Sequence, residues 1–410
     1  MKTGLNCNSE CDGKSYKVSI CMIVKDDPAN LERCIDSLLP IIYHKNDETG
    51  KRECELVIVD TGSSDITPNI ARKHADKFYV KKWVKWDFSR ARNYGIKRAS
   101  GEKIFVMDAD EVLPQECVYG LKYILFSDKV NDPTIFLKIK NYQKKDGSQF
   151  TTMMQPRIFK NDCKAIYECS VHNKPRTETP YYFANKITID HWGYMFEGRP
   201  KLQQKKNDRS VPMLMKEIKK DPDNLHAITH LVKHYQTMGQ IDEMQKLAER
   251  WIELMQKVEF HVGWTSYLEV FVTLVNSYIV KNDTQNMERV KTIAERFSQR
   301  LMNMYFIIGE HYSMLKQDEV ARVYMEHGLT LAQKPLDPYE MLLTQNTEII
   351  IPKYMNWLAC YYFRKGDYDK AGQFVNDGIH SNKSRLPLRW DVFNEDQSRK
   401  RLIVEDSNAA

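Results

Sequence analysis

Two carboxylates, Asp108 and Asp110, follow a short apolar run at residues 104–107 and are separated by a single alanine. The run Ile-Phe-Val-Met has the length and composition of a buried strand in a parallel sheet. Ligands of open α/β sheets bind beyond the carboxyl ends of the strands, so both acids should lie at a ligand site. Hard oxygen ligands of this kind suit a Mg²⁺ or Mn²⁺ ion that also holds a diphosphate.

Two further apolar runs, at residues 17–24 and 55–60, also have strand character, and each is followed by residues that favour a helix. After the first run, Asp27 is a plausible helix N-cap with Pro28 at the first helical position. The second run ends on Asp60 and leads through a turn-rich loop into the next helix. This order of strand, helix, strand and helix predicts a parallel sheet with right-handed crossovers.

Four segments resemble, in the same order, motifs of the family 2 glycosyltransferases with the A-type fold. They are VSICMIVKDDPANLERCIDSL, ELVIVDTGSSDIT, DFSRARNYGIKRASGEKIFVMDADE and ITIDHWGY. The resemblance covers about residues 17–200 and is greatest to the soluble branch with a helical C-terminal extension, which includes the bacteriocin S-glycosyltransferases of the sublancin type. It implies the α/β fold of nucleotide-diphospho-sugar transferases, a mixed sheet flanked by helices.

The resemblance also implies a site for a UDP-sugar donor. Asp60 would accept a hydrogen bond from the uracil imide, although an acid at a strand end can also serve only a turn. Arg92 and Asn93 match the family's nucleotide-side contacts, and a guanidinium suits a phosphate. An arginine here could equally lie in a surface ion pair. Asp87, which opens the same segment, could simply cap the following helix.

A metal site is implied by three matches to the family. Asp110 would bind the ion, Asp108 would lie at the ribose or the metal, and His191, in a His-x-Gly-Tyr context, would supply an imidazole to the same ion. Imidazole is an acceptable Mn²⁺ ligand. The Mn²⁺ or Mg²⁺ ion would act as a Lewis acid for the departing diphosphate, which assigns both acids to the catalytic step.

The catalytic base departs from the family pattern. Many relatives show Gly-x-Val-His-Glu where this chain has Cys169, Ser, Val, His172 and Asn173. An amide cannot accept a proton, so Asn173 cannot be a general base. Glu111, directly after the paired acids, is one substitute and His172 is another. A thiol acceptor would need a base less, because a few per cent of a free thiol is already ionised at neutral pH.

Composition indicates a non-membrane enzyme of more than one domain. The chain has 410 residues, which exceeds a single ordinary core. It contains no run of 18 or more apolar residues and begins with a polar segment, which argues against a membrane span and a secretory signal. Nine cysteines without zinc-type pairing predict reduced thiols and a cytoplasmic location. The net charge of +6 is modest and lacks a basic, aromatic stripe, so a nucleic-acid partner is not expected.

The pattern changes near residue 200. Before it, two strand-like runs flank Lys145-Asp146-Gly147, a hairpin turn signal. After it, helical spacing dominates, interrupted by polar breaks at 238–240, 281–283, 316–318 and 365–368. The irregular spacing predicts a degenerate helical-hairpin array similar to tetratricopeptide repeats, used for structure and dimerisation rather than as an acceptor surface. The predicted parts are an extension (1–16), a catalytic domain (17–200), a helical domain (201–384) and a tail (385–410).

These observations predict a metal-dependent, inverting glycosyltransferase that moves a hexose from UDP-glucose or UDP-N-acetylglucosamine to a cysteine or serine of a peptide or protein. Two alternatives stay open. The acceptor could be a saccharide of the cell surface, or the transferase fold could be retained in a catalytically impaired helical-repeat binding protein. The residues do not identify the sugar, the acceptor or the oligomeric state.

Overall fold

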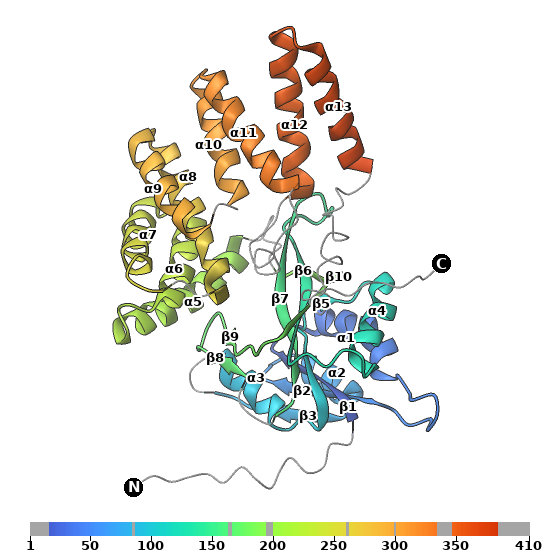
Figure 1. Ribbon diagram of the computed structural model, residues 1–410. Helices are drawn as coiled ribbons and strands as arrows, with labels where there is room; N and C mark the ends of the chain where they lie inside the picture. The colour runs from blue at the N-terminus through green and yellow to red at the C-terminus, as the bar shows by residue number, and fades with distance from the viewer. Residues whose placement is uncertain are drawn as a thin grey trace. The chain divides into compact units, whose positions relative to one another are not determined.

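The computed structural model describes residues 16–83, 87–162, 166–193, 200–259, 262–298, 301–333 and 347–383. These residues form two compact units, one on each side of residue 199 (Figure 1). Except for Tyr16, the predicted extension and tail lie outside the described residues. Six described cysteines, Cys21, Cys34, Cys54, Cys117, Cys169 and Cys360, carry free thiols. In the part of the chain that the structure describes, no helix is both long and apolar enough to span a bilayer.

The first unit is built on a mixed, eight-stranded sheet with the strand order β3-β2-β1-β4-β7-β6-β10-β5. Strands β1, β2 and β4 run parallel, as the sequence predicts, and β3, which was not predicted, is parallel to β2. Strand β7 is antiparallel to both β4 and β6, β10 is parallel to β6, and β5 is antiparallel to β10. The strands are β1 (Tyr16–Val24), β2 (Cys54–Asp60), β3 (Lys77–Val80), β4 (Gly101–Val106), β5 (Glu111–Val112), β6 (Thr134–Tyr142), β7 (Phe150–Lys160) and β10 (Tyr181–His191).

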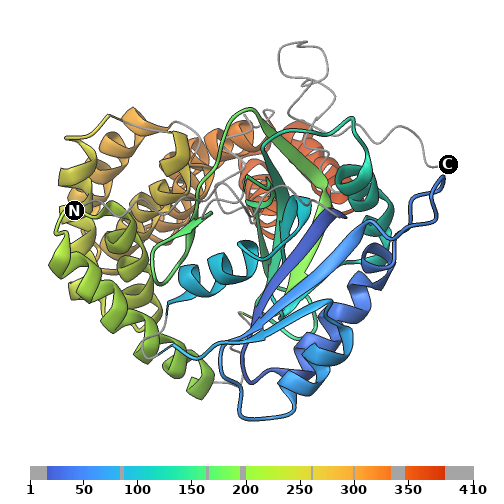
Figure 2. The ribbon, with the colours of Figure 1, turned by 90° about the horizontal axis from the view of Figure 1, so that it is seen from below.

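Helices cover both faces of this sheet (Figure 2). Strand alternation sends Val18, Ile20 and Met22 of β1 into a core shared with α1 and α4. Cys21 points the other way, into a smaller core that includes Ile96 at the end of α3. The sheet is therefore buried on both faces, as expected for parallel strands. The helices are α1 (Pro28–Ile42), α2 (Thr67–His74), α3 (Phe88–Ile96), the short η1 (Gln115–Cys117) and α4 (Val118–Phe126).

The helix starts agree with the sequence, with one difference in detail. Helix α1 begins at Pro28 after the N-cap residue Asp27, but the Asp27 carboxylate accepts from the Asn30 side chain at 3.0 Å rather than from a backbone N–H. Asp87 does cap α3, because its side chain accepts from the backbone N–H of Arg90 at 2.9 Å.

The predicted hairpin is present and contains a bulge. Strands β6 and β7 pair antiparallel around the turn at Gly147. Ile135 pairs with Ile158, but the next pair joins Phe136 to Pro156, so Arg157 is an extra residue on β7. A β-bulge of this kind bends the strand and re-aims the side chain of its extra residue. A small two-stranded sheet of β8 (Tyr167–Glu168) and β9 (Lys174–Pro175) follows.

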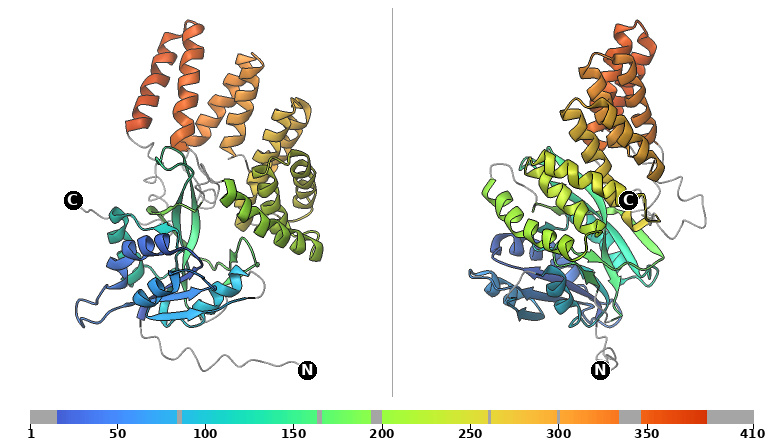
Figure 3. Two further views of the ribbon diagram at one scale, coloured as in Figure 1. Left: turned by 180° about the vertical axis from the view of Figure 1, so that it is seen from behind. Right: turned by 90° about the vertical axis from the view of Figure 1, so that its left-hand side faces the viewer.

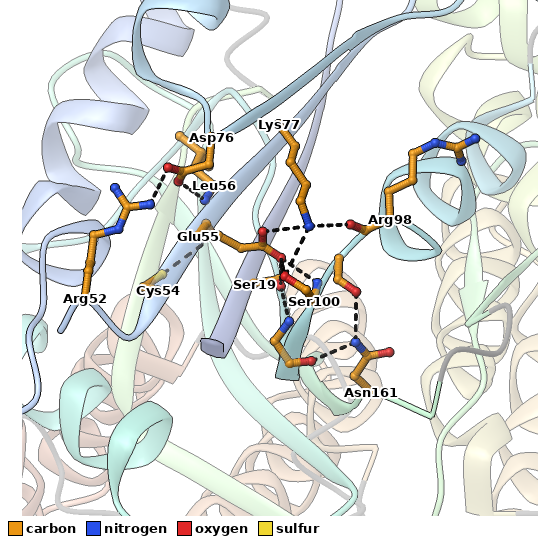
Figure 4. A network of polar contacts seen from close by, with 12 residues as sticks. Ser19, Arg52, Cys54, Glu55, Leu56, Asp76, Lys77, Arg98, Ser100 and Asn161 are labelled. Carbon is orange, nitrogen blue, oxygen red and sulfur yellow. Dashed lines mark hydrogen bonds and ion pairs between the residues drawn. The ribbon is translucent and has the colours of Figure 1, made fainter. Parts of the chain in front are cut away.

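A buried carboxylate ties the starts of three strands together (Figure 4). Glu55 of β2 has no exposed side-chain surface and accepts hydrogen bonds from the Ser19 hydroxyl at 2.6 Å and the Ser100 N–H at 2.5 Å. Lys77 forms an ion pair with its other oxygen at 2.9 Å. The Ser19 oxygen in turn accepts from the N–H of Gly101, at the start of β4. The network lies at the end of the strands opposite to Asp60 and Asp108.

Glu55→Ala is expected to lower the free energy of unfolding of this unit by about 3 kcal/mol, because Lys77 loses its buried counter-charge and the Ser19 hydroxyl and the Ser100 N–H lose their acceptor. Hydrogen exchange of the β1 and β2 amides measures the effect on this unit alone, which a global melt of a two-unit protein does not. Glu102→Ala, on the exposed surface of β4, is the matched control. Equal exchange in both variants would show that the Glu55 network contributes no stability.

The second unit consists of helical hairpins stacked in succession (Figure 3). Each of the four predicted breaks is a hairpin turn, and each turn contains one residue with positive φ: Gly239, Asn282, Lys316 and Gly366. A left-handed residue at this place ends the first helix of a hairpin. The repeat is thus visible in the turns, although the sequence intervals are irregular. The helices are α5 (Pro200–Lys220), α6 (Leu225–Thr237), α7 (Ile241–Met255), η2 (Val262–Leu268), α8 (Glu269–Val280), α9 (Thr284–Phe297), α10 (Met302–Met314), α11 (Asp318–Gln333), α12 (Thr347–Arg364) and α13 (Tyr368–Lys383).

Candidate functional site

Asp110 and His191 come together although 81 residues separate them in the chain. Asp110 lies in the turn after β4, and His191 is the last residue of β10. The antiparallel pairing of β5 with β10 sets His191 opposite Glu111, the residue after Asp110. As a result the His191 Nε2 atom lies 3.4 Å from Asp110 Oδ2. The pair that the sequence predicts as metal ligands is therefore adjacent.

The orientation of His191 suits a metal ligand. Its Nδ1 atom lies 2.7 Å from the side-chain oxygen of Asn141, which comes from the neighbouring strand β6. A side-chain oxygen can only accept, so this contact places the proton of a neutral imidazole on Nδ1, and the unprotonated Nε2, which faces Asp110, can then bind a metal ion. Burial lowers the pKa of His191, but the hydrogen bond and charge of Asp110 outweigh it, and the pKa is raised overall. A metal ion bound between Asp110 and His191 would replace the proton that a charged His191 carries on Nε2.

Gly193 packs directly against these two side chains. A Cβ atom built on Gly193 would lie 2.1 Å from Asp110 Oδ2 and 2.6 Å from His191 Nε2. Both distances are far below ordinary van der Waals contact, so only glycine leaves the two atoms where they are. The His-x-Gly spacing of the sequence thus has a steric cause.

The donor set fits a hard divalent ion in part. Among the described residues, no group of three or more His, Cys, Asp or Glu side chains is arranged to hold a metal. Asp110 and His191 offer two ligands, one oxygen and one nitrogen. Mg²⁺ usually keeps several waters and takes its remaining ligands from substrate phosphates. A two-residue site is therefore compatible with an ion that binds together with a diphosphate, and it would act there as a Lewis acid.

Asp108 is held by arginines rather than directed at Asp110. Its Oδ1 atom accepts from Arg92 Nη2 at 2.5 Å, and its Oδ2 atom lies 3.6 Å from Arg157 Nη1. Burial alone would raise the pKa of Asp108, but the two guanidinium groups outweigh it and hold the pKa well below its usual value. Asp108 is thus ionised at neutral pH. Its predicted contact with the ribose or the metal stays a prediction.

Both oxygens of Glu111, the first candidate base, have partners. Oε2 accepts from the backbone N–H of Asp108 at 2.8 Å, and Oε1 accepts from Arg157. The side chain has no exposed surface. Burial raises the pKa of Glu111 to about 6, against the opposing effect of Arg157. These contacts favour a role for Glu111 in holding the turn, and its role as the general base stays a prediction.

Asp60 is buried at the end of β2 and has one oxygen without a hydrogen-bond partner. Oδ1 accepts from the N–H groups of Gly62 and Ser63, both at 2.8 Å. Oδ2 is also buried, and no hydrogen bond to it is found. A buried acceptor that stays unpaired costs about 1–3 kcal/mol. The turn therefore supplies hydrogen-bond donors to Oδ1 of Asp60. Oδ2 could accept a hydrogen bond from a ligand.

Arg92 and Asn93, neighbours on α3, have different surroundings. Arg92 donates from Nε to Asn173 at 3.3 Å and contacts Asp108, and its Nη1 atom is buried without a hydrogen bond. Asn93 instead binds the backbone of β8: it donates to the Tyr167 carbonyl at 2.8 Å and accepts from the Tyr167 N–H at 3.0 Å. Asn93 therefore positions this segment, and its predicted contact with the nucleotide stays a prediction.

The segment that replaces the family's base is a strained loop. Cys169 and His172 both have positive φ, 64° and 49°. The left-handed conformation at Cys169 is one that glycine adopts freely, and glycine is what many relatives have there. Asn173 donates to the Cys169 carbonyl at 3.1 Å and accepts from Arg92. The backbone at Cys169 thus has a conformation that glycine would adopt without strain, and the Asn173 side-chain oxygen binds Arg92. The role of His172 as a base stays a prediction.

Three residues of the site escaped the sequence analysis. Arg157 could have been suspected, because it is a charge next to a proline inside an apolar strand. Asn141 carried no local signal, since its place beside His191 depends on the register of two strands 50 residues apart. Gly193 lies in the segment ITIDHWGY, but its steric role depends on its closeness to Asp110 and His191 in the folded chain.

Comparison with known proteins gives the class. Residues 19–180 match the family described as Glycosyl transferase family 2, so the chain carries a domain of this family. An uncharacterized glycosyltransferase of Rickettsia bellii is 26% identical over 234 residues, covering 53% of this chain and 73% of that protein. A TPR repeat-containing protein of Synechococcus elongatus is 28% identical over 251 residues, covering 58% of this chain and 56% of that protein. The chain thus spans little more than half of this second relative. The family match and the named relatives support a glycosyltransferase.

Among solved structures, MamA is similar with a TM-score of 0.34 and 16% identity, covering 47% of this chain and 98% of that one. A thermophilic TPR protein of Thermus thermophilus has a TM-score of 0.29 and 16% identity, covering 48% of this chain and 93% of that one. Scores this low say nothing about function.

Proposed function

We propose that this protein transfers a hexose from UDP-glucose or UDP-N-acetylglucosamine to a cysteine or serine side chain of a peptide or protein, with the help of Mn²⁺ or Mg²⁺. The observation that carries the proposal is the adjacent pair of Asp110 and His191, whose placement only glycine at position 193 leaves undisturbed. Such a pair suits an ion that binds with a diphosphate leaving group.

The position of Asp60 supports a nucleotide donor. Strands β2 and β4 both lie next to β1, so their carboxyl ends are about 10 Å apart at the usual strand spacing. Asp60 ends one of these strands and Asp108 follows the other. A nucleoside diphosphate can span that distance, with its base at the unpaired Asp60 oxygen and its phosphates towards Asp110. Arg92, with one buried N–H lacking a hydrogen bond, supplies a positive charge on the same side.

The absence of an acid at position 173 supports a thiol acceptor. Asn173 cannot take a proton, and both oxygens of Glu111 have partners. A nucleophile that ionises by itself fits such a site, and a thiol does so far more readily than a hydroxyl. A cytoplasmic location, where thiols stay reduced, and dimerisation through the helical unit belong to the same proposal.

The direct test is mass spectrometry of cysteine- and serine-containing peptides after incubation with each UDP-sugar and Mn²⁺. We expect a mass increase of one hexose residue from UDP-glucose or of one N-acetylhexosamine residue from UDP-N-acetylglucosamine, with cysteine preferred and a rate that rises with pH towards the thiol pKa. Modification of an oligosaccharide with every peptide untouched would assign the protein to glycan assembly.

Two observations also favour a second candidate, a helical-repeat binding protein whose transferase domain no longer catalyses transfer. Both oxygens of Glu111 have partners, and Asn173 stands where relatives have an acid. This candidate predicts UDP binding without any release of UDP from UDP-sugars. Measuring UDP release with several UDP-sugars, with and without Mn²⁺, separates the two functions.

Asp60→Asn is expected to weaken UDP binding about 10- to 100-fold, measured by calorimetry. The amide oxygen can still accept from Gly62 and Ser63, but the amide nitrogen would replace the free oxygen and face the imide donor of uracil. Loss of a hydrogen bond to a charged group costs about 1.5–3 kcal/mol.

Asp65→Asn is the matched control, since this acid lies in the same loop but is exposed. Unchanged UDP affinity in Asp60→Asn would assign Asp60 to the turn alone.

A further inference from the structure

We propose that Arg157 is a positioning residue that holds the turn presenting Asp110, and that the β-bulge in β7 serves to place it there. The effect of Arg157 on the rate of transfer rests on the proposed function. Its effect on the turn at Asp110 can be tested without a sugar donor. Arg157 lies in none of the segments that resemble the glycosyltransferase motifs.

The bulge lies where β4 ends. Strand β7 pairs antiparallel with β4, and the last pair towards the carboxyl end of β4 joins Phe105 to Ile158. Arg157 precedes Ile158 in β7 and therefore lies just beyond this last pair. Against β6, on its other side, β7 carries Arg157 as the extra residue between Pro156 and Ile158. Proline cannot donate a hydrogen bond to a neighbouring strand, so Pro156 is tolerated beside this β-bulge. The bulge thus frees Arg157 from regular pairing at the carboxyl end of β4.

The guanidinium of Arg157 bridges the two acids that flank Asp110 in sequence. Nη1 lies 3.6 Å from Asp108 Oδ2, and Nη2 donates to Glu111 Oε1. Nη2 also lies 3.1 Å from the side-chain oxygen of Gln155, which fixes the plane of the group. The Arg157 side chain is only 7% exposed and that of Glu111 is fully buried.

The turn itself is closed by two backbone contacts. The Glu111 N–H donates to the Asp108 carbonyl at 3.1 Å, and the Asp108 N–H donates to the Glu111 carboxylate at 2.8 Å. Arg157 fixes that carboxylate, so it fixes the second contact as well. Asp110 lies inside the turn and pairs with His191 from β10. A shift of the turn would therefore separate the two proposed metal ligands.

Charge explains why an arginine is needed. Arg92, Asp108, Arg157 and Glu111 form a row in which positive and negative groups alternate. Without Arg157, Glu111 would be a buried carboxylate without a counter-charge, and Asp108 would keep Arg92 alone. Lysine could supply the charge but not two donors in one plane.

The first measurement is amide hydrogen exchange over residues 107–112. In Arg157→Met we expect exchange at least about tenfold faster there than in wild type. In Arg157→Met/Glu111→Gln the buried charge is gone and the overall melting temperature should recover, yet the turn should stay poorly protected because the bridge to Asp108 is missing. Lys160→Gln, an exposed cation on the same strand, should leave exchange unchanged.

Return of wild-type protection in the double variant would overturn the proposal, because Arg157 would then only neutralise Glu111. The same conclusion would follow if Arg157→Met exchanged like wild type. This measurement needs no donor, so it can succeed even where the proposed transfer fails.

The second measurement is UDP release. We expect kcat to fall about 100-fold in Arg157→Met, since a misplacement of about 1 Å can have that effect, with a smaller loss in Arg157→Lys. UDP affinity should change little, because Asp60 and the base end of the site are untouched. A wild-type kcat in Arg157→Met would overturn the positioning role.

Discussion

Asp110→Asn is expected to reduce sugar transfer at least about 100-fold while the fold stays intact. Asparagine keeps the shape of the side chain but removes the charge that attracts a divalent ion to the diphosphate, and stabilisation of a leaving group of this kind contributes factors of about 100–1,000 to a rate. His191→Ala should have a similar effect. The measurement is UDP release as a function of Mn²⁺ concentration, together with the melting temperature of each variant.

Two comparisons make this result specific. Asp36→Asn, an exposed acid on α1, should leave the rate unchanged. Asn141→Ala should mainly raise the Mn²⁺ concentration needed for half-maximal rate, by about 10- to 100-fold, because residues that orient a ligand act on metal affinity. Full activity of the wild-type protein after EDTA treatment would remove the metal from the mechanism altogether.

The strands and helices that build the site could be predicted because their signals are local. The runs before Asp60 and Asp108 are apolar over four or more residues, and each ends on an acid. Parallel strands collect their carboxyl ends at one edge, so the approximate place of both acids followed from the order of elements. The four hairpin turns of the helical unit were visible for the same reason, as short polar breaks in helical spacing.

Contacts that depend on strand register could not be predicted. Asn141 meets His191 only because β6 and β10 pair in one register, and that register shifts between Ala184 and Thr188. Arg157 reaches Asp108 and Glu111 only because a bulge re-aims it. A one-residue slip would turn such side chains to the other face of the sheet. No local pattern in the sequence carries this information.

The hydrogen-bond partners of individual polar residues could not be predicted from the sequence either. Asn93 and Glu111 were expected at the nucleotide and at the proton transfer. Both have hydrogen-bond partners within the protein, and the two expected roles stay predictions. An amide or a carboxylate can bind a ligand or a neighbouring backbone equally well. Which of its atoms already have partners depends on the three-dimensional arrangement of the chain.

Gly193→Ala is expected to abolish most of the activity with little loss of stability. The added methyl group would overlap Asp110 Oδ2 and His191 Nε2, which a Cβ would approach to 2.1 and 2.6 Å. Both atoms are ends of side chains, so they can move aside without unfolding the protein, and the distance between the two ligands would then change. A displacement of about 1 Å at a catalytic group can lower a rate about 100-fold. UDP release at saturating Mn²⁺ and the melting temperature measure the two effects.

Gly372→Ala is the matched control, because a Cβ at this helical glycine would meet nothing within 4 Å. Alanine favours a helix over glycine by up to about 1 kcal/mol, so this variant should be active and slightly more stable. Activity of Gly193→Ala equal to that of wild type would mean that the space between Asp110 and His191 is not used by the reaction. The substitution alters neither ligand and adds no charge, so a loss of activity with an unchanged melting temperature would locate the chemistry at this pair of side chains. A fall in both would instead show that Gly193 is needed for the fold of this edge of the sheet.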